Sequence, residues 1–215
     1  YDSAGIALNN GEISLQKTEG EVDDLAVPSS VDASCGIGHT RWSTHGEPTT
    51  ENAHPHTDCT GDVAVVHNGI VDNYADIKNG LRDDHVFESD TDTEVISHLL
   101  ESHLADGVSL RAAVQRTTNE LTGSYAIAVT AVGHDGVVVA RQDSPLLVGH
   151  GDDATYIGSD ATAFIEYTDR VTYLENGDIA HITRDDVEIH NDGEPVTRTT
   201  KTLDWDADAA GKSGY

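Results

Sequence analysis

The order of the predicted elements constrains the fold more than any other feature of the sequence. Alternating apolar residues on both sides of an Asn-Asn-Gly turn predict a β-hairpin over 4–16. Two apolar segments, 34–42 and 62–68, predict further strands, and from Ser124 onward short strands follow one another between Gly, Asp and Asn turns. Helical patterns are confined to the middle of the chain, at 73–83, 92–104 and 109–121. Because strands and helices are grouped and do not alternate, the sequence predicts an α+β layered sandwich and argues against a Rossmann fold.

Two further segments carry weaker structural signals. Residues 20–27 predict a short helix that Pro28 would end. Residues 43–61 are polar and rich in turn formers, and loops of this length in a compact domain are usually functional or disordered.

Charge limits the classes of partner. The 215 residues include 12 Lys and Arg against 39 Asp and Glu, a formal net charge of −27. The negative electrostatic field of such a chain repels phosphate backbones and anionic lipids, so we expect neither nucleic-acid nor membrane partners. No apolar run approaches the roughly 18 residues of a transmembrane helix, and no leader-like segment opens the sequence. A surface saturated with carboxylates is typical of salt-loving organisms, and we predict a halophilic, cytoplasmic protein that salt stabilises by screening self-repulsion.

The densest group of residues capable of chemistry lies in four short segments: HTRWSTHGEP (39–48), NAHPH (52–56), HNG (67–69) and SDTDTEV (89–95). Arg41 fits a surface ion pair or a bidentate clamp for a carboxylate. Trp42 fits either a core position or a loop that covers a site. Asn68-Gly69 fits a simple turn, or a side-chain amide beside an open backbone N–H, which together can stabilise an oxyanion.

Metal sites are not expected. His54-x-His56 with Cys59 resembles a zinc cluster, but a fourth ligand and a second spaced pair are missing. Asp90-x-Asp92-x-Glu94 resembles a calcium loop only superficially, because the segment is predicted to be helical and lacks the glycine that such a loop needs. The two cysteines, Cys35 and Cys59, are too few for a disulfide framework, and we expect both to be buried structural thiols. We expect no cofactor.

Taken together, these segments resemble the glutaminase domains of the glucosamine-6-phosphate synthases, a family of class II glutamine amidotransferases. The resemblance is carried by YDSAGIA (1–7), GIGHTRWSTHGEP (36–48), NAHPH (52–56), VVHNGIVDN (65–73) and SDTDTEVISHL (89–99). It continues through GSYAIAV (123–129), IGSDATA (157–163) and LENGDIA (174–180), and therefore covers nearly the whole chain.

The resemblance implies a fold and a reaction. These domains are four-layer αββα sandwiches of the N-terminal-nucleophile hydrolase type, and the first strand and helix of that fold would be missing from this chain. Residues 1–203 would form the glutaminase domain and 204–215 the start of a linker to an absent sugar-isomerase domain. The domain would hydrolyse L-glutamine and supply the ammonia that converts fructose 6-phosphate to glucosamine 6-phosphate, in a homodimer when the protein is full length.

The resemblance also assigns roles to individual residues. Arg41 would bind the α-carboxylate of glutamine and Asp92 its α-ammonium group. Thr44 and His45 would line the carboxylate end of the site. Trp42 would lie on the loop that closes over the ligand, and Asn68 with Gly69 would form the oxyanion hole.

In the family, a cysteine at the mature N-terminus attacks the amide, with the α-amino group as base. The sequence opens at Tyr1, inside the motif that follows this cysteine, and neither Cys35 nor Cys59 matches the nucleophile position. We therefore expect the chain as it stands to be inactive in hydrolysis. The alternatives are the glutaminase domain of another class II amidotransferase, a non-catalytic glutamine-binding module and, more remotely, a calcium-binding acidic surface protein.

Overall fold

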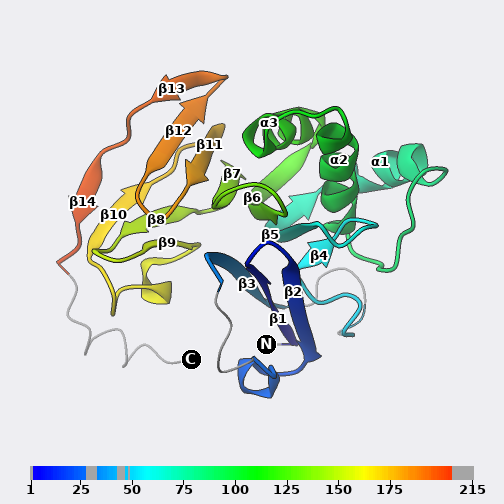
Figure 1. Ribbon diagram of the computed structural model, residues 1–215, viewed down its shortest axis with the longest axis horizontal. Coiled ribbons are helices and arrows are strands. Elements are labelled where there is room, and N and C mark those ends of the chain that lie inside the picture. Colours follow the sequence, from blue (N-terminus) through cyan, green and yellow to red (C-terminus); the bar gives the residue numbers. More distant parts are fainter. Residues whose placement is uncertain (1, 28–32, 43–46, 48, 205–215) are drawn as a thin grey trace.

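The computed structural model describes residues 2–27, 33–42, 47 and 49–204 (Figure 1). Two residues assigned from sequence, Thr44 and His45, lie outside this range. So does nearly all of the proposed linker at 204–215.

The central layer is a seven-stranded antiparallel sheet, in the order β13-β12-β11-β7-β6-β5-β4. Its strands are β4 (His56–Thr57), β5 (Val63–Val71), β6 (Gly123–Ala131), β7 (Val137–Gln142), β11 (Asp178–Ile182), β12 (Val187–Asn191) and β13 (Glu194–Val196). Side chains alternate between the two faces of a strand, so both faces of this sheet contribute to a core. Along β5, Val63 and Val65 join one buried cluster, whereas Ala64 and Val66 join the other.

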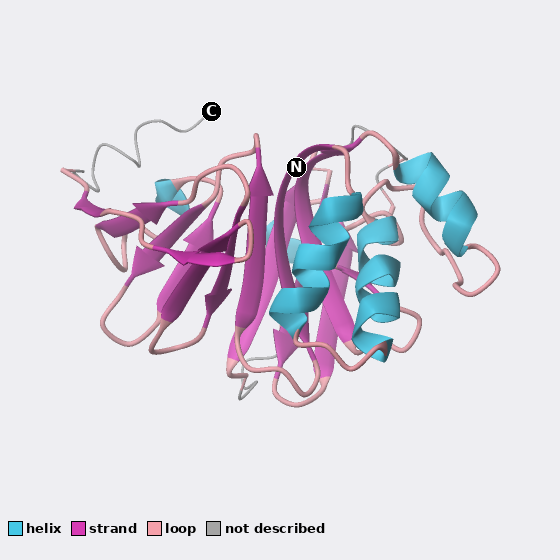
Figure 2. Cartoon of the chain, turned by 90° about the horizontal axis from the view of Figure 1, so that it is seen from above, coloured by secondary structure: helices cyan, strands magenta, loops and turns pink. Residues whose placement is uncertain are grey.

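Two helices, α2 (Glu94–Ala105) and α3 (Leu110–Glu120), cover one face of this sheet, and α1 (Tyr74–Leu81) lies beside α2 toward the edge of the sheet, as the views in Figures 1 and 2 show. The apolar stripe of α2, including Val95, Ile96 and Leu100, is buried against the sheet. Ser109 caps α3, because its hydroxyl accepts a hydrogen bond from the Ala112 N–H at 3.2 Å.

Two smaller sheets pack on the opposite face. One has the order β2-β1-β3 and the other β14-β10-β8-β9. Their strands are β1 (Ser3–Asn9), β2 (Ile13–Glu19), β3 (Cys35–Arg41), β8 (Leu147–His150), β9 (Thr155–Gly158), β10 (Arg170–Tyr173) and β14 (Thr200–Thr202). Ala7, Ile37 and Val148 of these sheets share one buried cluster with Val66 and Val139 of the central sheet.

The α+β sandwich predicted from sequence is confirmed. Within the described range, one helical layer covers two stacked layers of sheet, and the remaining helical segments are single 3-10 turns, Val22–Asp24 and Ala161–Ala163. The helix predicted for 20–27 is wrong, since only the first of these turns forms there. No helix among the described residues is long and apolar enough to cross a bilayer.

Carboxylates are concentrated on the surface. Among the described Asp and Glu residues, only Asp58, Asp92, Glu94 and Asp178 are buried. Each accepts at least one hydrogen bond from the protein, which offsets its loss of hydration.

Candidate active site

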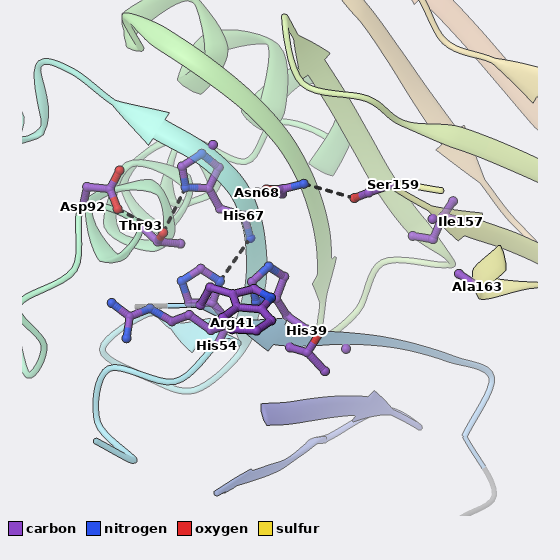
Figure 3. Close-up of a pocket in the computed structure, with 15 residues that line it drawn as sticks. His39, Arg41, His54, His67, Asn68, Asp92, Thr93, Ile157, Ser159 and Ala163 are labelled. Atoms are coloured by element: carbon purple, nitrogen blue, oxygen red, sulfur yellow. Dashed lines mark hydrogen bonds between the residues drawn. The ribbon is translucent and has the colours of Figure 1, made fainter. Parts of the chain in front are cut away.

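A cavity of about 520 Å³ lies where the three sheets meet (Figure 3). Its walls come from the end of β3, from the middle of β5, from the residues preceding α2, and from the end of β9. The lining includes five of the residues assigned from sequence: Arg41, Trp42, Asn68, Gly69 and Asp92. These residues are distant in sequence, so only the tertiary fold brings them together.

Arg41 is the last residue of β3 and is buried, although it carries a guanidinium group. Burial lowers the pKa of this group from its ordinary value of 12.5, and the carboxylates of Asp92 and Asp2 act in the opposite direction. Guanidinium remains charged in proteins, so Arg41 places a positive charge at one side of the cavity.

Asp92 lies just before α2 and is also buried. Its Oδ2 accepts a hydrogen bond from the Val71 N–H at 2.7 Å, and its Oδ1 lies 3.5 Å from the donating hydroxyl of Thr93. Figure 3 shows Arg41 extending its guanidinium toward the side of the cavity that carries Asp92. One end of the cavity therefore presents a cation and an anion near each other.

Asn68 and Gly69 are inside β5 and do not form a turn, so the turn interpretation is wrong. They pair with Ala126 and Tyr125 of β6. The Asn68 side-chain amide donates to the hydroxyl of Ser159 at 3.3 Å, across the cavity from the charged pair (Figure 3). Gly69 has a φ of 145°, and a Cβ at this position would collide with the carbonyl of Ser124, so the backbone here requires glycine.

Trp42 follows Arg41 and is 69% exposed, which excludes the core position considered for it. It lines the cavity while most of its side chain faces solvent. This placement is compatible with a residue at the cavity entrance.

Three histidines line the cavity floor, and no role was assigned to them from sequence. The imidazole rings of His39 and His54 lie 4.5 Å apart, and His54 Nδ1 accepts a hydrogen bond from the His67 N–H at 3.5 Å. His67 Nδ1 lies 2.9 Å from the hydroxyl of Thr93. Burial lowers the pKa of all three, that of His39 to about 4. The rings are therefore neutral near pH 7 and add no charge that would compete with Arg41 for an anionic group.

The histidines carry a signal that sequence inspection can recover, because His39 and His67 belong to the motifs that contain Arg41 and Asn68. Thr93 likewise adjoins Asp92. Ser159 has no such signal, since its contact with Asn68 spans 91 residues.

The two cysteines differ from expectation. Cys59 is exposed and Cys35 is only partly buried, so the expectation of two buried thiols is wrong. Cys59 also does not join the HPH motif: His56 Nε2 lies 2.9 Å from the hydroxyl of Thr91, and His54 packs between His39 and His56. Neither cysteine lines the cavity described above.

Comparison with known proteins places this chain in a family. The model of the glutamine amidotransferase domain matches residues 39–166, more than half of the chain. A glutamine–fructose-6-phosphate aminotransferase (isomerizing) of Halobacterium salinarum is 71% identical over all of this chain and 36% of its own length. Its counterpart in Methanothermobacter thermautotrophicus is 42% identical over all of this chain and 37% of its length. The chain thus spans little more than a third of the length of these curated relatives.

The fold has solved counterparts. The glutamine phosphoribosylpyrophosphate amidotransferase of B. subtilis superimposes with a TM-score of 0.75 and 25% identity, over 88% of this chain and 43% of that one. The acidic composition fits the similarity to a Halobacterium protein. From its sequence, its fold and the family model that it matches, the chain belongs to the glutamine amidotransferase domain family.

Proposed function

We propose that this chain is the glutaminase part of a glutamine–fructose-6-phosphate aminotransferase. It binds L-glutamine, whose side-chain amide yields ammonia for the conversion of fructose 6-phosphate to glucosamine 6-phosphate. The observation that carries the proposal is a single cavity with Arg41 and Asp92 at one side and the Asn68 amide at the other. The names of the longer relatives support the choice of acceptor.

Recognition of the amino acid uses the charged end of the cavity. Arg41 binds the α-carboxylate, for which a planar guanidinium offers two parallel N–H donors. Asp92 binds the α-ammonium group with Oδ1, while Oδ2 stays engaged by the Val71 N–H. Opposite charges on the two groups fix the direction of the ligand and place its amide near β5.

The chemistry takes place at the other end. Attack on the side-chain carbonyl turns its oxygen into an oxyanion, and the Asn68 side chain and the Gly69 backbone N–H donate hydrogen bonds to it. The attacking group is the N-terminal cysteine that the class II resemblance implies, and Trp42 lies on the segment that closes over the ligand. The resemblance assigns Thr44 and His45 to the carboxylate end.

The proposal extends to the whole protein. The relatives are about three times as long as this chain, which leaves room for the sugar-isomerase domain that would receive the ammonia. We propose that the full-length protein is a cytoplasmic homodimer in which ammonia passes between the two kinds of domain.

Calorimetry with L-glutamine in concentrated KCl tests the binding step, which does not need the nucleophile. We expect L-glutamine to bind, and N-acetylglutamine and glutamine α-amide, which each lack one charged group, to fail. Arg41→Ala and the isosteric Asp92→Asn should each weaken binding by about tenfold or more, the scale of a charged hydrogen bond. Arg116→Ala is the matched control, because Arg116 is paired with Asp106 on the surface. Affinity unchanged in Arg41→Ala would contradict the proposed orientation.

A second measurement separates an enzyme from a passive binding module. The full-length protein, with its N-terminal cysteine, should release glutamate and ammonia from glutamine. Binding without any ammonia release would favour the module.

A further inference from the structure

Four side chains with metal-ligating atoms converge outside the cavity. They are Cys59, His85, His98 and Glu101, hereafter the Cys-His-His-Glu cluster. Cys59 lies in the turn between β4 and β5, and His85 follows α1. His98 and Glu101 are three residues apart on α2 and therefore share one face of the helix. None of the four lines the proposed glutamine cavity.

Four of the six ligand-to-ligand distances in the cluster lie within about 0.4 Å of the edges of a tetrahedral zinc site. Cys59 Sγ lies 3.7 Å from His85 Nδ1 and 3.7 Å from His98 Nδ1. Glu101 Oε2 lies 2.9 Å from the first of these nitrogens and 3.1 Å from the second. All four ligand atoms lie within 4.8 Å of one another. Ordinary zinc bond lengths in a tetrahedron give S···N edges of about 3.5 Å and N···O edges of about 3.3 Å.

The contact of His85 with Ser102, outside the cluster, leaves His85 Nδ1 available to bind a metal. The Ser102 hydroxyl donates its proton to the His98 carbonyl at 3.0 Å, so toward His85 Nε2, 3.0 Å away, it acts as an acceptor. His85 therefore carries its proton on Nε2 and turns the lone pair of Nδ1 toward the cluster. Fixing the tautomer of a ligand histidine in this way is the usual role of groups around a metal site.

The outer contacts of His98 agree. Its Nε2 is buried without a hydrogen-bond partner in the described part of the chain, and its closest carboxylate atom is Glu94 Oε1 at 3.8 Å. A carboxylate on this side favours the proton on Nε2 and the lone pair on Nδ1. Glu94 is itself held by the backbone N–H groups of Glu88 and Ser89, at 2.7 and 2.9 Å.

A purely hydrogen-bonded cluster accounts for less of this geometry. Glu101 Oε2 also accepts from the Cys59 N–H at 3.2 Å, so three donors would share one oxygen while the thiol contributed little. A bound cation explains why the sulfur, the two nitrogens and the oxygen all surround one point. We propose that the Cys-His-His-Glu cluster binds one Zn²⁺ ion.

The donor set selects the metal. One thiolate, two imidazoles and one carboxylate suit Zn²⁺, whereas Ca²⁺ and Mg²⁺ require oxygen ligands. Four protein ligands close the coordination shell, which is the pattern of a structural site. The ion would tie the β4–β5 turn and the segment after α1 to α2, the helix that begins just beyond Asp92.

Metal titration of chelator-treated protein tests this proposal. Because the surface carries many carboxylates, the titration is done in concentrated KCl with excess Mg²⁺, which occupies non-specific sites. We expect one equivalent of Zn²⁺ to bind and to raise the melting temperature by several degrees. Co²⁺ in its place should give the intense visible bands of a tetrahedral site and a thiolate-to-cobalt charge-transfer band.

The two cysteines provide a matched pair of variants. Cys59→Ser should lose the charge-transfer band and most of the thermal shift, and Cys35→Ser should keep both. His98→Gln should also lose stoichiometric binding, and circular dichroism of this variant checks that it is folded. The proposal is overturned if Cys59→Ser binds Zn²⁺ as tightly as the unaltered chain, or if Mg²⁺ displaces all bound zinc.

Discussion

At the scale of single residues, Asn68 lines the cavity and is also the proposed hydrogen-bond donor to the oxyanion. Its side-chain amide faces the cavity from β5 and donates to Ser159. If it donates to the oxyanion, Asn68→Ala should lower kcat by about 10²–10³-fold and change the KM for glutamine little. The measurement is glutamate release by the full-length enzyme. Ser159→Ala, which removes only the neighbouring hydroxyl, should have a much smaller effect, and a normal kcat in Asn68→Ala would refute the assigned role.

The buried histidines predict how stability depends on pH. Burial lowers the pKa of His39 to about 4 and that of His56 to about 3, whereas an unfolded histidine titrates near 6.5. Below pH 6.5 the unfolded chain therefore binds more protons, so this contribution to stability is complete above 6.5 and is lost as the pH falls toward 4.

The size of this dependence is measurable. Each such histidine contributes a slope of up to about 1.4 kcal/mol per pH unit to the free energy of unfolding between pH 6.5 and its folded pKa. Urea unfolding at several pH values, at constant KCl, should show a shallower slope for His39→Asn than for the unaltered chain. Identical slopes would mean that His39 is not held neutral by the fold.

Residues of the candidate site could be brought together from sequence where they belong to short motifs. Arg41, Asn68 and Asp92 each lie in a recognisable segment, and all three line one cavity. Contacts between distant segments could not be predicted. Cys59 shows the difference: proximity in sequence suggested partners in the HPH motif, but its contacts in space are 26 to 42 residues further along the chain.

At the scale of elements, the strand β5 contributes residues both to the buried core and to the lining of the cavity. Gly69 lies where this strand approaches β6 so closely that a side chain has no room. Gly69→Ala should destabilise the protein by roughly 2 kcal/mol or more, because it adds a clash to an unfavourable φ. Urea unfolding measures the change.

Two other glycines serve as controls for this prediction. Gly133 also has a positive φ, of 77°, but a Cβ at this position would meet no other atom within 4 Å, so Gly133→Ala should cost less than Gly69→Ala. Gly80 lies in α1 with open space around it, and Gly80→Ala should stabilise by about 0.5–1 kcal/mol. Equal costs at positions 69 and 133 would show that the close approach of the strands is not the cause.

Strongly periodic elements could be predicted from sequence, and weakly patterned ones could not. The helical patterns at 92–104 and 109–121 match α2 and α3 to within two residues at each end. The strands β13 and β14 carry little sequence signal, because each has only three residues and these are mostly exposed. The sequence pattern places the NAHPH segment in a polar loop, yet all five of its residues are buried, since histidine and asparagine can be buried once they find hydrogen-bond partners.

At the scale of the whole molecule, the net charge of −27 governs stability in salt. Nearly all described carboxylates lie outside the core, where they repel one another across solvent. Raising KCl from about 0.1 M to about 3 M shortens the screening length severalfold, so the melting temperature should rise substantially. A thermal denaturation series tests this, and equal stability at both concentrations would contradict salt adaptation.

The cavity is lined by residues from three separate sheets, so it forms only in a fully folded molecule. A molecule with the β1–β3 sheet undocked, or with the β8–β9 pair unformed, lacks either Arg41 or Ser159 at the pocket. If the pocket binds L-glutamine as proposed, only fully assembled chains bind it, and its presence shifts the folding equilibrium toward them. In a cell, the supply of this amino acid would act as quality control on newly made copies of the protein.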